Sequence, residues 1–438
     1  MDLLPYPSPD AEARITAVVN RGLDFGAGDH ENVQRILDDV KQRGDAALVE
    51  YTNRFDSQAI TVDNLAVTES EMEAAKGLVD DDFRAALFRA AAQVESFHKR
   101  QVRNSWIETS RPGVILGQLV NPVSAAGIYV PGARGGMTPL VSSVLMGAIP
   151  AKIAGVKHIA MVTPPMADGT VNPHLLVAAG MVGVDTIYKV GSAWAIAALA
   201  YGTGTVSPVN VIVGPGNIYV TLAKKIVSGS VGIDMIAGPS EILVIADDSA
   251  DPAFISADLL SQAEHDPLAS SILITDSHDL ALAVADEVAR QLAVLPRRAI
   301  AEQSLGGYGA ILVVDGIQTA IDLSNRIAPE HLELQVRDPF AWVGSIRNAG
   351  AVFMGAYTPE PVGDYIAGPN HVLPTGGTAR FSSALSVDCF MKQTSLVYYT
   401  ADAFYREAGD VVRLAETEGL GAHAESVRVR LRNKDRFS

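Results

Sequence analysis

The chain has 438 residues, of which 48% are hydrophobic and 19% charged, and this composition excludes an intrinsically disordered protein. Its 34 Lys and Arg residues against 50 Asp and Glu residues give a formal net charge of −16, which argues against a nucleic-acid-binding protein. The only cysteine, Cys389, excludes an internal disulfide and indicates a reducing compartment. Residues 1–10 show no secretory signal, and no apolar stretch approaches the roughly 20 residues of a membrane span. We expect a cytoplasmic protein without membrane or nucleic-acid partners.

The first hundred residues predict helices. Apolar residues recur three and four positions apart over 31–51, and residues 71–98 show a similar, alanine-rich pattern. No chemistry is visible in these segments, which we interpret as scaffold.

The middle of the chain alternates short β-branched runs with stretches of helical length. Such alternation predicts parallel sheets that are covered on both faces, and so an α/β fold. The series of strands is too long for one small open sheet, so we favour two α/β units. The alternative is a (β/α)₈ barrel, but the long helical start and tail of the chain fit a barrel poorly. The expected strands are 127–130, 159–162, 186–190, 209–213, 242–245, 271–275 and 310–314, and the expected helices include 141–154, 193–201 and 219–228.

Regularity is lost after about Phe381, and the tail is expected to be helical at 401–415 and basic at its end, which we interpret as a solvated helix face. Glycine-rich turns follow strands at 132–136 and 214–216, but neither a P-loop nor a strict G-x-G-x-x-G fingerprint is present. These glycines either bring the backbone close to a nucleotide or simply turn the chain.

A metal site is suggested by Gln262 and His265, three residues apart near the end of a helix expected over 251–265. This spacing puts both side chains on one helical face, and Asp364 and His423 are residue types that would complete four ligands. The alternative is a capped helix in which His265 binds a backbone carbonyl.

Glu330 and His331 follow Pro329, and because proline is favoured at the first helical position we expect both in a first helical turn. The positive potential at a helix N-terminus would lower the pKa of His331, which suits a general base. The alternative is that Glu330 only favours the helix dipole while His331 lies on the surface.

The segment 363–374 combines glycines and prolines with Asp364 and His371, which is typical of a loop that forms a site. Cys389 has mostly apolar neighbours, so we interpret it as a buried thiol rather than a nucleophile.

Taken together, these segments resemble the histidinol dehydrogenase family over nearly the whole chain. Each motif is weak alone, but their shared order is specific. The motifs lie at 44–48, 51–56, 129–132, 214–217, 237–241, 261–267, 328–333, 368–374 and 418–423.

The resemblance implies a zinc- and NAD-dependent enzyme that oxidises L-histidinol to L-histidinal and then to L-histidine, the last steps of histidine biosynthesis, with two NAD reduced. His331 matches the general base for the alcohol proton, and Glu330 matches the residue that activates water for attack on the aldehyde. A water route agrees with the composition, because Cys389 lies away from every catalytic signature and a thiohemiacetal needs a catalytic cysteine.

The resemblance also implies ligands and contacts for one zinc ion per subunit, the substrate and the cofactor. The zinc ligands match Gln262, His265, Asp364 and His423. The resemblance implies that the zinc ion holds the substrate through its imidazole and amino nitrogens rather than activating water. The substrate-contacting positions match Ser240, Gln262, His265, His331, Asp364, His371, Glu418 and His423, and the cofactor-contacting positions match Tyr129 and Asn217.

The implied fold has two incomplete Rossmann-like, doubly wound domains with a small helical N-terminal piece and an extended C-terminal piece. The family forms a homodimer with shared active sites, in which the tail with Glu418 and His423 completes the partner's site. The expected boundaries are 1–22 for the N-terminal piece, 23–128 and 242–385 for the domain with the zinc and catalytic residues, 129–241 for the NAD-side domain, and 386–438 for the tail.

Two features depart from the family pattern. Trp194 stands where many members carry glutamine near the cofactor, and an indole cannot accept the hydrogen bond that an amide accepts. The turn 132–139 is about three residues longer than usual, with Arg134 either near the cofactor pyrophosphate or, as we slightly favour, in solvent.

Other functions stay open beside histidinol oxidation. A family relative would oxidise another small alcohol, such as a sulfonated polyol, although His371 and Glu418 favour histidinol. A zinc-stabilised binding protein would not need the Glu330–His331 pair, and a zinc hydrolase would be expected to carry a motif such as H-E-x-x-H, which is absent.

Overall fold

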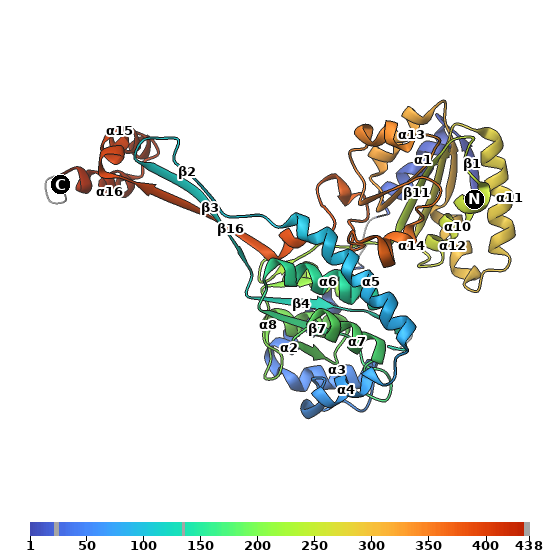
Figure 1. The fold of residues 1–438 in the computed structure, drawn as a ribbon, viewed down its shortest axis with the longest axis horizontal. Helices are drawn as coiled ribbons and strands as arrows, with labels where there is room; N and C mark the ends of the chain where they lie inside the picture. Colours follow the sequence, from blue (N-terminus) through green and yellow to red (C-terminus); the bar gives the residue numbers. More distant parts are fainter. Residues whose placement is uncertain (22–25, 134–135, 433–438) are drawn as a thin grey trace. The chain divides into compact units, whose positions relative to one another are not determined.

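The computed structural model describes residues 1–21, 26–133 and 136–432 (Figure 1). The chain divides into two compact units: the first comprises Met1–Val102 and Val123–Phe390, and the second Arg103–Pro122 and Met391–Ser438. Within the described residues, no helix combines the length and the apolar character that a membrane crossing requires.

The first unit contains a six-stranded parallel sheet, which carries the expected catalytic residue His331. Its order is β1-β13-β12-β11-β14-β15. Every pair of neighbouring strands is parallel. The strands are β1 (Asp2–Pro5), β11 (Glu241–Ala246), β12 (Ser270–Thr275), β13 (Ala310–Val313), β14 (His331–Gln335) and β15 (Ala351–Met354).

Helices cover both faces of this sheet, which explains why its central strands are apolar throughout (Figure 1). Leu243 and Ile245 of β11 point to one face, and Ile242 and Val244 to the other, as the period of two along a strand requires. The first face packs against α1 (Pro9–Val19) and α13 (Ile317–Ile327), and the second against α10 (Pro252–Ala263), α11 (His278–Leu292) and α12 (Arg298–Tyr308).

A five-stranded parallel sheet of order β10-β9-β4-β7-β8 forms the other core of the first unit. Its strands are β4 (Ala125–Tyr129), β7 (His158–Val162), β8 (Thr186–Tyr188), β9 (Val211–Val213) and β10 (Gly232–Ile233). One hydrophobic cluster joins it to α2 (Ala27–Arg43), α3 (Asp45–Phe55), α8 (Ser192–Tyr201) and α9 (Ile218–Val227). The sheet also contacts α6 (Val141–Ala154), which packs in turn with α7 (Pro173–Val182) and α5 (Asp81–His98), while α4 (Glu69–Lys76) packs against α7.

The second unit is built on an antiparallel sheet of β2 (Trp106–Glu108), β3 (Val114–Pro122) and β16 (Met391–Tyr399). Two helices that pack against each other follow β16, α15 (Ala401–Thr417) and α16 (Gly421–Arg432).

The two separate parallel sheets confirm the α/β class and show that the barrel alternative is wrong. The helix expected over 31–51 is wrong as one element, because Gly44 adopts a φ of +57° and separates α2 from α3. The helix expected over 71–98 is likewise two helices, since Asp80 caps a new N-terminus at α5. The strands β1 and β16 were not expected, and the domain boundaries stay a prediction.

Candidate functional site

The expected catalytic residues lie where β11 and β14 begin. His331 opens β14 and pairs with Ile242, one residue into β11. The helix α10 runs back from the end of β11 to the start of β12, so its last turn, with Gln262, faces the same edge. The site is therefore at the amino edge of this sheet, whereas ligands of doubly wound sheets usually bind at the carboxyl edge.

The prediction that Glu330 and His331 sit in a first helical turn is wrong. The helix α13 ends before Pro329, with Ala328 in the left-handed region at φ 56°, and the chain then enters β14. The stretch His331–Gln335 alternates polar residues with leucine, the period of a strand, and this signal outweighs the proline in the sequence.

His331 is a buried, neutral imidazole with one nitrogen fixed. Its Nδ1 lies 2.8 Å from the backbone oxygen of Glu241, and since a carbonyl only accepts, Nδ1 carries the hydrogen. The Nε2 atom therefore keeps a free lone pair, 4.0 Å from Oε1 of Glu360. Burial lowers the pKa of His331 to about 4, so the expected direction is confirmed, but its cause is burial and not a helix terminus.

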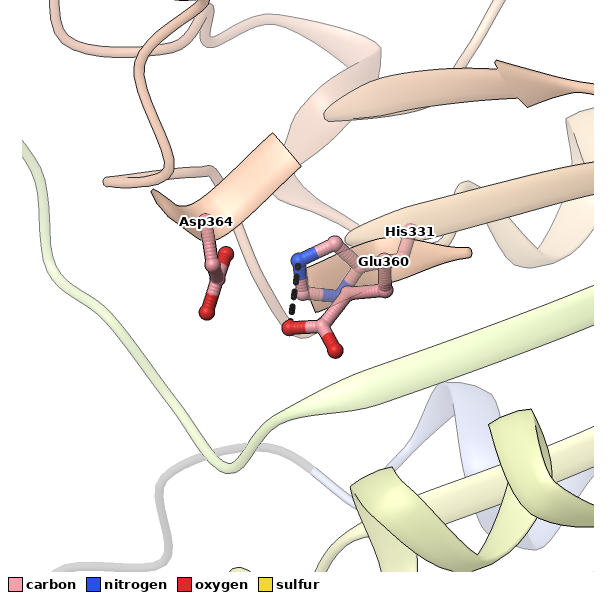
Figure 2. Close-up of side chains that lie close together, drawn as sticks. All are labelled: His331, Glu360 and Asp364. Atoms are coloured by element: carbon pink, nitrogen blue, oxygen red, sulfur yellow. Dashed lines mark ion pairs between the residues drawn. The ribbon is translucent and has the colours of Figure 1, made fainter. Parts of the chain in front are cut away.

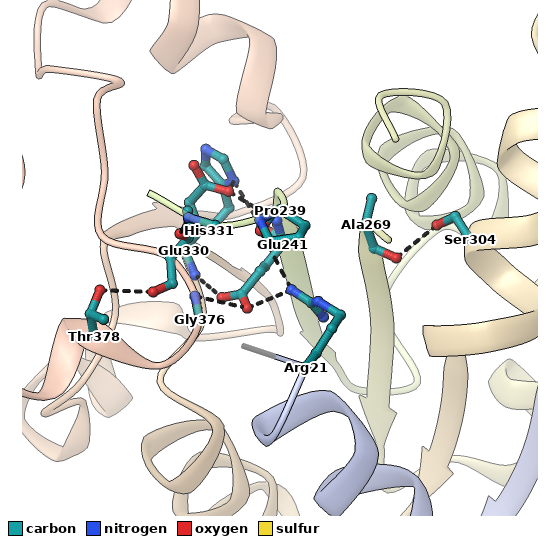
Figure 3. Close-up of polar contacts among 11 residues, drawn as sticks. Arg21, Pro239, Glu241, Ala269, Ser304, Glu330, His331, Gly376 and Thr378 are labelled. Atoms are coloured by element: carbon teal, nitrogen blue, oxygen red, sulfur yellow. Dashed lines mark hydrogen bonds and ion pairs between the residues drawn. The ribbon is translucent and has the colours of Figure 1, made fainter. Parts of the chain in front are cut away.

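Glu330 is buried beside His331 and is held by the start of β11. Its Oε2 accepts a hydrogen bond of 2.9 Å from the backbone N–H of Glu241 (Figure 3). Burial raises the pKa of Glu330 well above its ordinary value, and a carboxylate with a raised pKa is a stronger base towards water.

Asp364 forms a tight cluster with His331 and Glu360 (Figure 2). One possible ligand atom from each lies within 4.8 Å of the others, a spacing suited to a metal ion. Asp364 lies on a π-helical turn, Gly363–Ala367, that follows the short helix α14 (Glu360–Val362). Burial raises the pKa of Glu360 to about 8.

Glu360 is a site residue that the sequence analysis missed. The available signal was its position four residues before Asp364, which puts both carboxyl groups on one side of a helical turn.

Gln262 and His265 have properties that suit the metal site. The buried Oε1 of Gln262 has no hydrogen-bond partner among the described residues, as expected of an oxygen whose partner is a ligand or an ion. Burial lowers the pKa of His265 and so favours the neutral imidazole, the form that binds metals. The charge of the nearby Asp364 opposes this effect and raises the pKa. An amide oxygen, an imidazole and a carboxylate fit a zinc ion.

The other expected substrate contacts are divided between the units. Ser240 immediately precedes β11 and is half-buried. In His371, Nε2 is buried without a partner in the described part of the chain, and burial lowers the pKa of this imidazole. Glu418, at the end of α15, and His423, in α16, belong to the second unit and are exposed within it.

Of the two expected cofactor contacts, Tyr129 is buried and Asn217 is exposed. Tyr129 ends β4, and its hydroxyl oxygen accepts a hydrogen bond of 3.1 Å from the backbone N–H of Ser192. Asn217 caps α9 and accepts hydrogen bonds from the backbone N–H groups of Tyr219 and Val220. The structure thus gives both side chains a structural role, and their contact with a cofactor stays a prediction.

Trp194 is part of the core, with 4% of its surface exposed. Its Nε1 donates a hydrogen bond of 3.1 Å to the Thr52 hydroxyl, and its rings stack on Tyr51 and Phe55. The indole at this position is therefore satisfied by the protein itself. Arg134, which was expected near the pyrophosphate or in solvent, lies outside the described residues.

Comparisons with known proteins give a consistent result. The family model described as Histidinol dehydrogenase matches residues 26–431. A histidinol dehydrogenase of Desulfotalea psychrophila is 54% identical over 425 residues, which cover 97% of this chain and 98% of that protein. One of Geobacter metallireducens is 53% identical over 435 residues, with 99% of each chain covered. The crystal structure of histidinol dehydrogenase from Elizabethkingia anophelis matches with a TM-score of 0.92 and 38% identity and covers 99% of both chains.

Proposed function

Because this chain belongs to the histidinol dehydrogenase family, we propose that it oxidises L-histidinol to L-histidinal and then to L-histidine, with two NAD reduced per turnover. The observation that carries the proposal is the buried Glu330–His331 pair next to Asp364. A four-electron oxidation of this kind needs one base for the alcohol and one for water, and these two side chains are such bases.

A zinc ion would be held by Gln262, His265 and Asp364 together with His423. The unpaired amide oxygen of Gln262 and the action of the Asp364 charge on His265 support this ligand set. When bound, zinc would fix the substrate through its imidazole and amino nitrogens, which orients the alcohol without activating water.

His331 removes the proton of the substrate alcohol. Since Nδ1 is held by the Glu241 carbonyl, the free lone pair of Nε2 is the only one available to accept a proton. NAD would accept the hydride in each step. Because the imidazole is neutral at neutral pH, it is ready to act in both steps.

Glu330 takes the second role, the activation of water for attack on the aldehyde. Its carboxyl group is held through one oxygen by the Glu241 N–H and keeps the other for water. A thiol route is disfavoured because burial raises the pKa of Cys389 and so keeps this thiol protonated and weakly nucleophilic.

We further propose that Ser240, His371 and Glu418 contact the substrate. Tyr129 and Asn217 would contact NAD.

We also propose that two copies of the chain form a homodimer and share their sites. The second unit supports this proposal, because its own fold leaves large apolar side chains exposed, and such surfaces usually mark an interface. These side chains include Trp106, Ile107, Val397, Tyr398 and Leu414.

The test is the amount of NADH formed per L-histidinol consumed by the purified protein, before and after removal of zinc. Two NADH per histidinol, lost on chelation and restored by zinc, would support the whole proposal. No NADH from histidinol while zinc remains bound would contradict it and point to another alcohol, such as a sulfonated polyol, as the substrate.

A further inference from the structure

Glu241, the first residue of β11, is buried between segments that are distant in the sequence (Figure 3). One oxygen of its carboxyl group accepts a hydrogen bond of 2.6 Å from Nη2 of Arg21 and one of 3.1 Å from the backbone N–H of Gly376. The other oxygen accepts a bond of 3.0 Å from the backbone N–H of Glu330. One carboxyl group therefore ties the N-terminal segment and the loop at Gly376 to the catalytic segment.

All three partners of this carboxyl group are donors. A guanidinium and two backbone N–H groups can only donate, and a carboxylate, which accepts at both oxygens, satisfies all of them. Burial alone would favour the neutral acid, and the charge of Arg21, itself 8% exposed, opposes this effect. Burial prevails and raises the pKa of Glu241. Arg21 and the Gly376 N–H hold one oxygen of this carboxyl group in place through their hydrogen bonds.

The contacts between Glu241 and Glu330 are reciprocal. The backbone N–H of Glu330 binds the Glu241 side chain, and the backbone N–H of Glu241 binds the Glu330 side chain at 2.9 Å. The backbone oxygen of Glu241 also holds Nδ1 of His331. Both catalytic side chains are thus held by one residue, which is itself buried.

We propose that Glu241, held in place by Arg21, is a positioning residue that sets the orientation of Glu330 and His331 for both oxidation steps. The inference rests on the proposed function, because it assigns these two side chains as the bases. It predicts that replacement of the Glu241 carboxyl group slows both steps without weakening substrate binding.

The experiment measures kcat and KM for L-histidinol and L-histidinal in Glu241→Gln. The Gln side chain replaces one of the two accepting oxygens by an NH₂ group, which can only donate. In either orientation of the amide this NH₂ faces another donor, either a backbone N–H or the guanidinium. The two donors repel each other, so the Glu330 segment must shift. We expect kcat to fall about 100-fold on both substrates with nearly unchanged KM, because misplacement by about 1 Å has effects of this size.

Variants of Arg21 separate positioning from folding. Arg21→Met removes the cation and should reproduce the loss of kcat, whereas Arg21→Lys keeps a charge and a donor and should retain most of the activity. The double variant Arg21→Met/Glu241→Gln should have a kcat no lower than that of Glu241→Gln, because both substitutions disrupt the same interaction. The matched control is Glu71→Gln, which breaks the ion pair of Glu71 with the buried Lys189 (2.6 Å) and should leave kcat unchanged.

The outcomes are distinct. If the wild-type protein forms no NADH from histidinol, the proposed function is wrong and this inference falls with it. If the wild type is active and folded Glu241→Gln keeps kcat within about threefold, the positioning role is wrong. Should Glu241→Gln not fold, equal kcat values for Arg21→Met and Arg21→Lys would overturn the inference, and a loss confined to Arg21→Met would support it.

Discussion

The adjacent residues Glu330 and His331 show pKa shifts in opposite directions from one cause. Burial disfavours the charged form of any group, so it raises the pKa of the carboxyl group and lowers that of the imidazole. The result is a neutral imidazole next to a carboxyl group of high proton affinity, and these properties suit different steps.

This difference predicts how the two steps divide between the residues. His331→Asn should abolish oxidation of both histidinol and histidinal, because the amide that replaces the imidazole is not a base. Glu330→Gln keeps an oxygen that can accept from the Glu241 N–H, so it should fold and lose mainly the aldehyde step, by about 100-fold or more. Steady-state rates with histidinal supplied separately test this, and equal losses of Glu330→Gln on both substrates would contradict the division.

The lowered pKa of His331 also predicts a pH-dependent stability. Its pKa is about 4 in the folded protein against an ordinary value of 6.5, so between these values the unfolded chain binds more protons and acid destabilises the fold. From pH 7 to pH 5 this one residue should lower the free energy of unfolding by about 2 kcal/mol.

The measurement is urea unfolding of wild type and His331→Asn at pH 7 and pH 5, with a chelator present. The variant lacks this titration, so its stability relative to wild type should rise by about the same amount on acidification. A difference between the two proteins that is independent of pH would show that His331 titrates normally in the folded state.

At the scale of elements, the packing of helix α6 on strand β4 depends on the small size of Gly147. A Cβ at this position would lie 2.6 Å from Cγ2 of Ile128, which is closer than real contacts allow. The central position of α6 thus requires glycine because of the sheet below it, although glycine disfavours helices.

Alanine substitutions at two helical glycines should therefore have opposite effects. Gly147→Ala should lower the free energy of unfolding by about 1–3 kcal/mol through overpacking against β4. In α12, a Cβ at Gly306 would have no atom within 4 Å. Gly306→Ala should therefore raise the free energy of unfolding by about 0.5–1 kcal/mol. Denaturant unfolding of both variants tests this, and equal effects would mean that contact with β4 does not decide the choice of glycine.

Local sequence patterns predicted helices and strands well where only one pattern was present in a segment. The helix at α6 matches its expected bounds despite Pro150, and the buried runs became strands of parallel sheets. At β14 two signals competed: Pro329 indicated a helix start, and the alternation in His331–Gln335 indicated a strand. The strand prevailed because β11 and β15 flank it and pair with its backbone.

The candidate site was predictable only to the extent that its residues carry recognisable motifs. Gln262 and Asp364 were found this way, whereas Glu360 carries no motif of its own and contributes through its position beside His331. The contact between Arg21 and Glu241 joins residues 220 positions apart, and no pattern in one sequence predicts such a pair. The site thus depends on contacts between distant segments, such as Arg21 with Glu241, that no local pattern reveals.

At the scale of the whole molecule, the proposed ligands are distributed over both units. Gln262, His265 and Asp364 belong to the first unit, and His423 to the second. The proposed homodimer places the second unit of one copy at the site of the other. Each site would then need His331 from one chain and His423 from its partner.

Mixing two inactive variants tests this arrangement directly. His331→Asn and His423→Asn should each be inactive alone, but a mixed dimer contains one site with both defects and one site with neither. Coexpression should therefore restore about a quarter of the wild-type activity, since about half of the dimers are mixed and each has one intact site of two. The measurement is NADH formation from histidinol by the coexpressed and copurified chains, with each variant alone as the control. If both residues of a site came from the same chain, every site would carry one defect and coexpression would restore no activity.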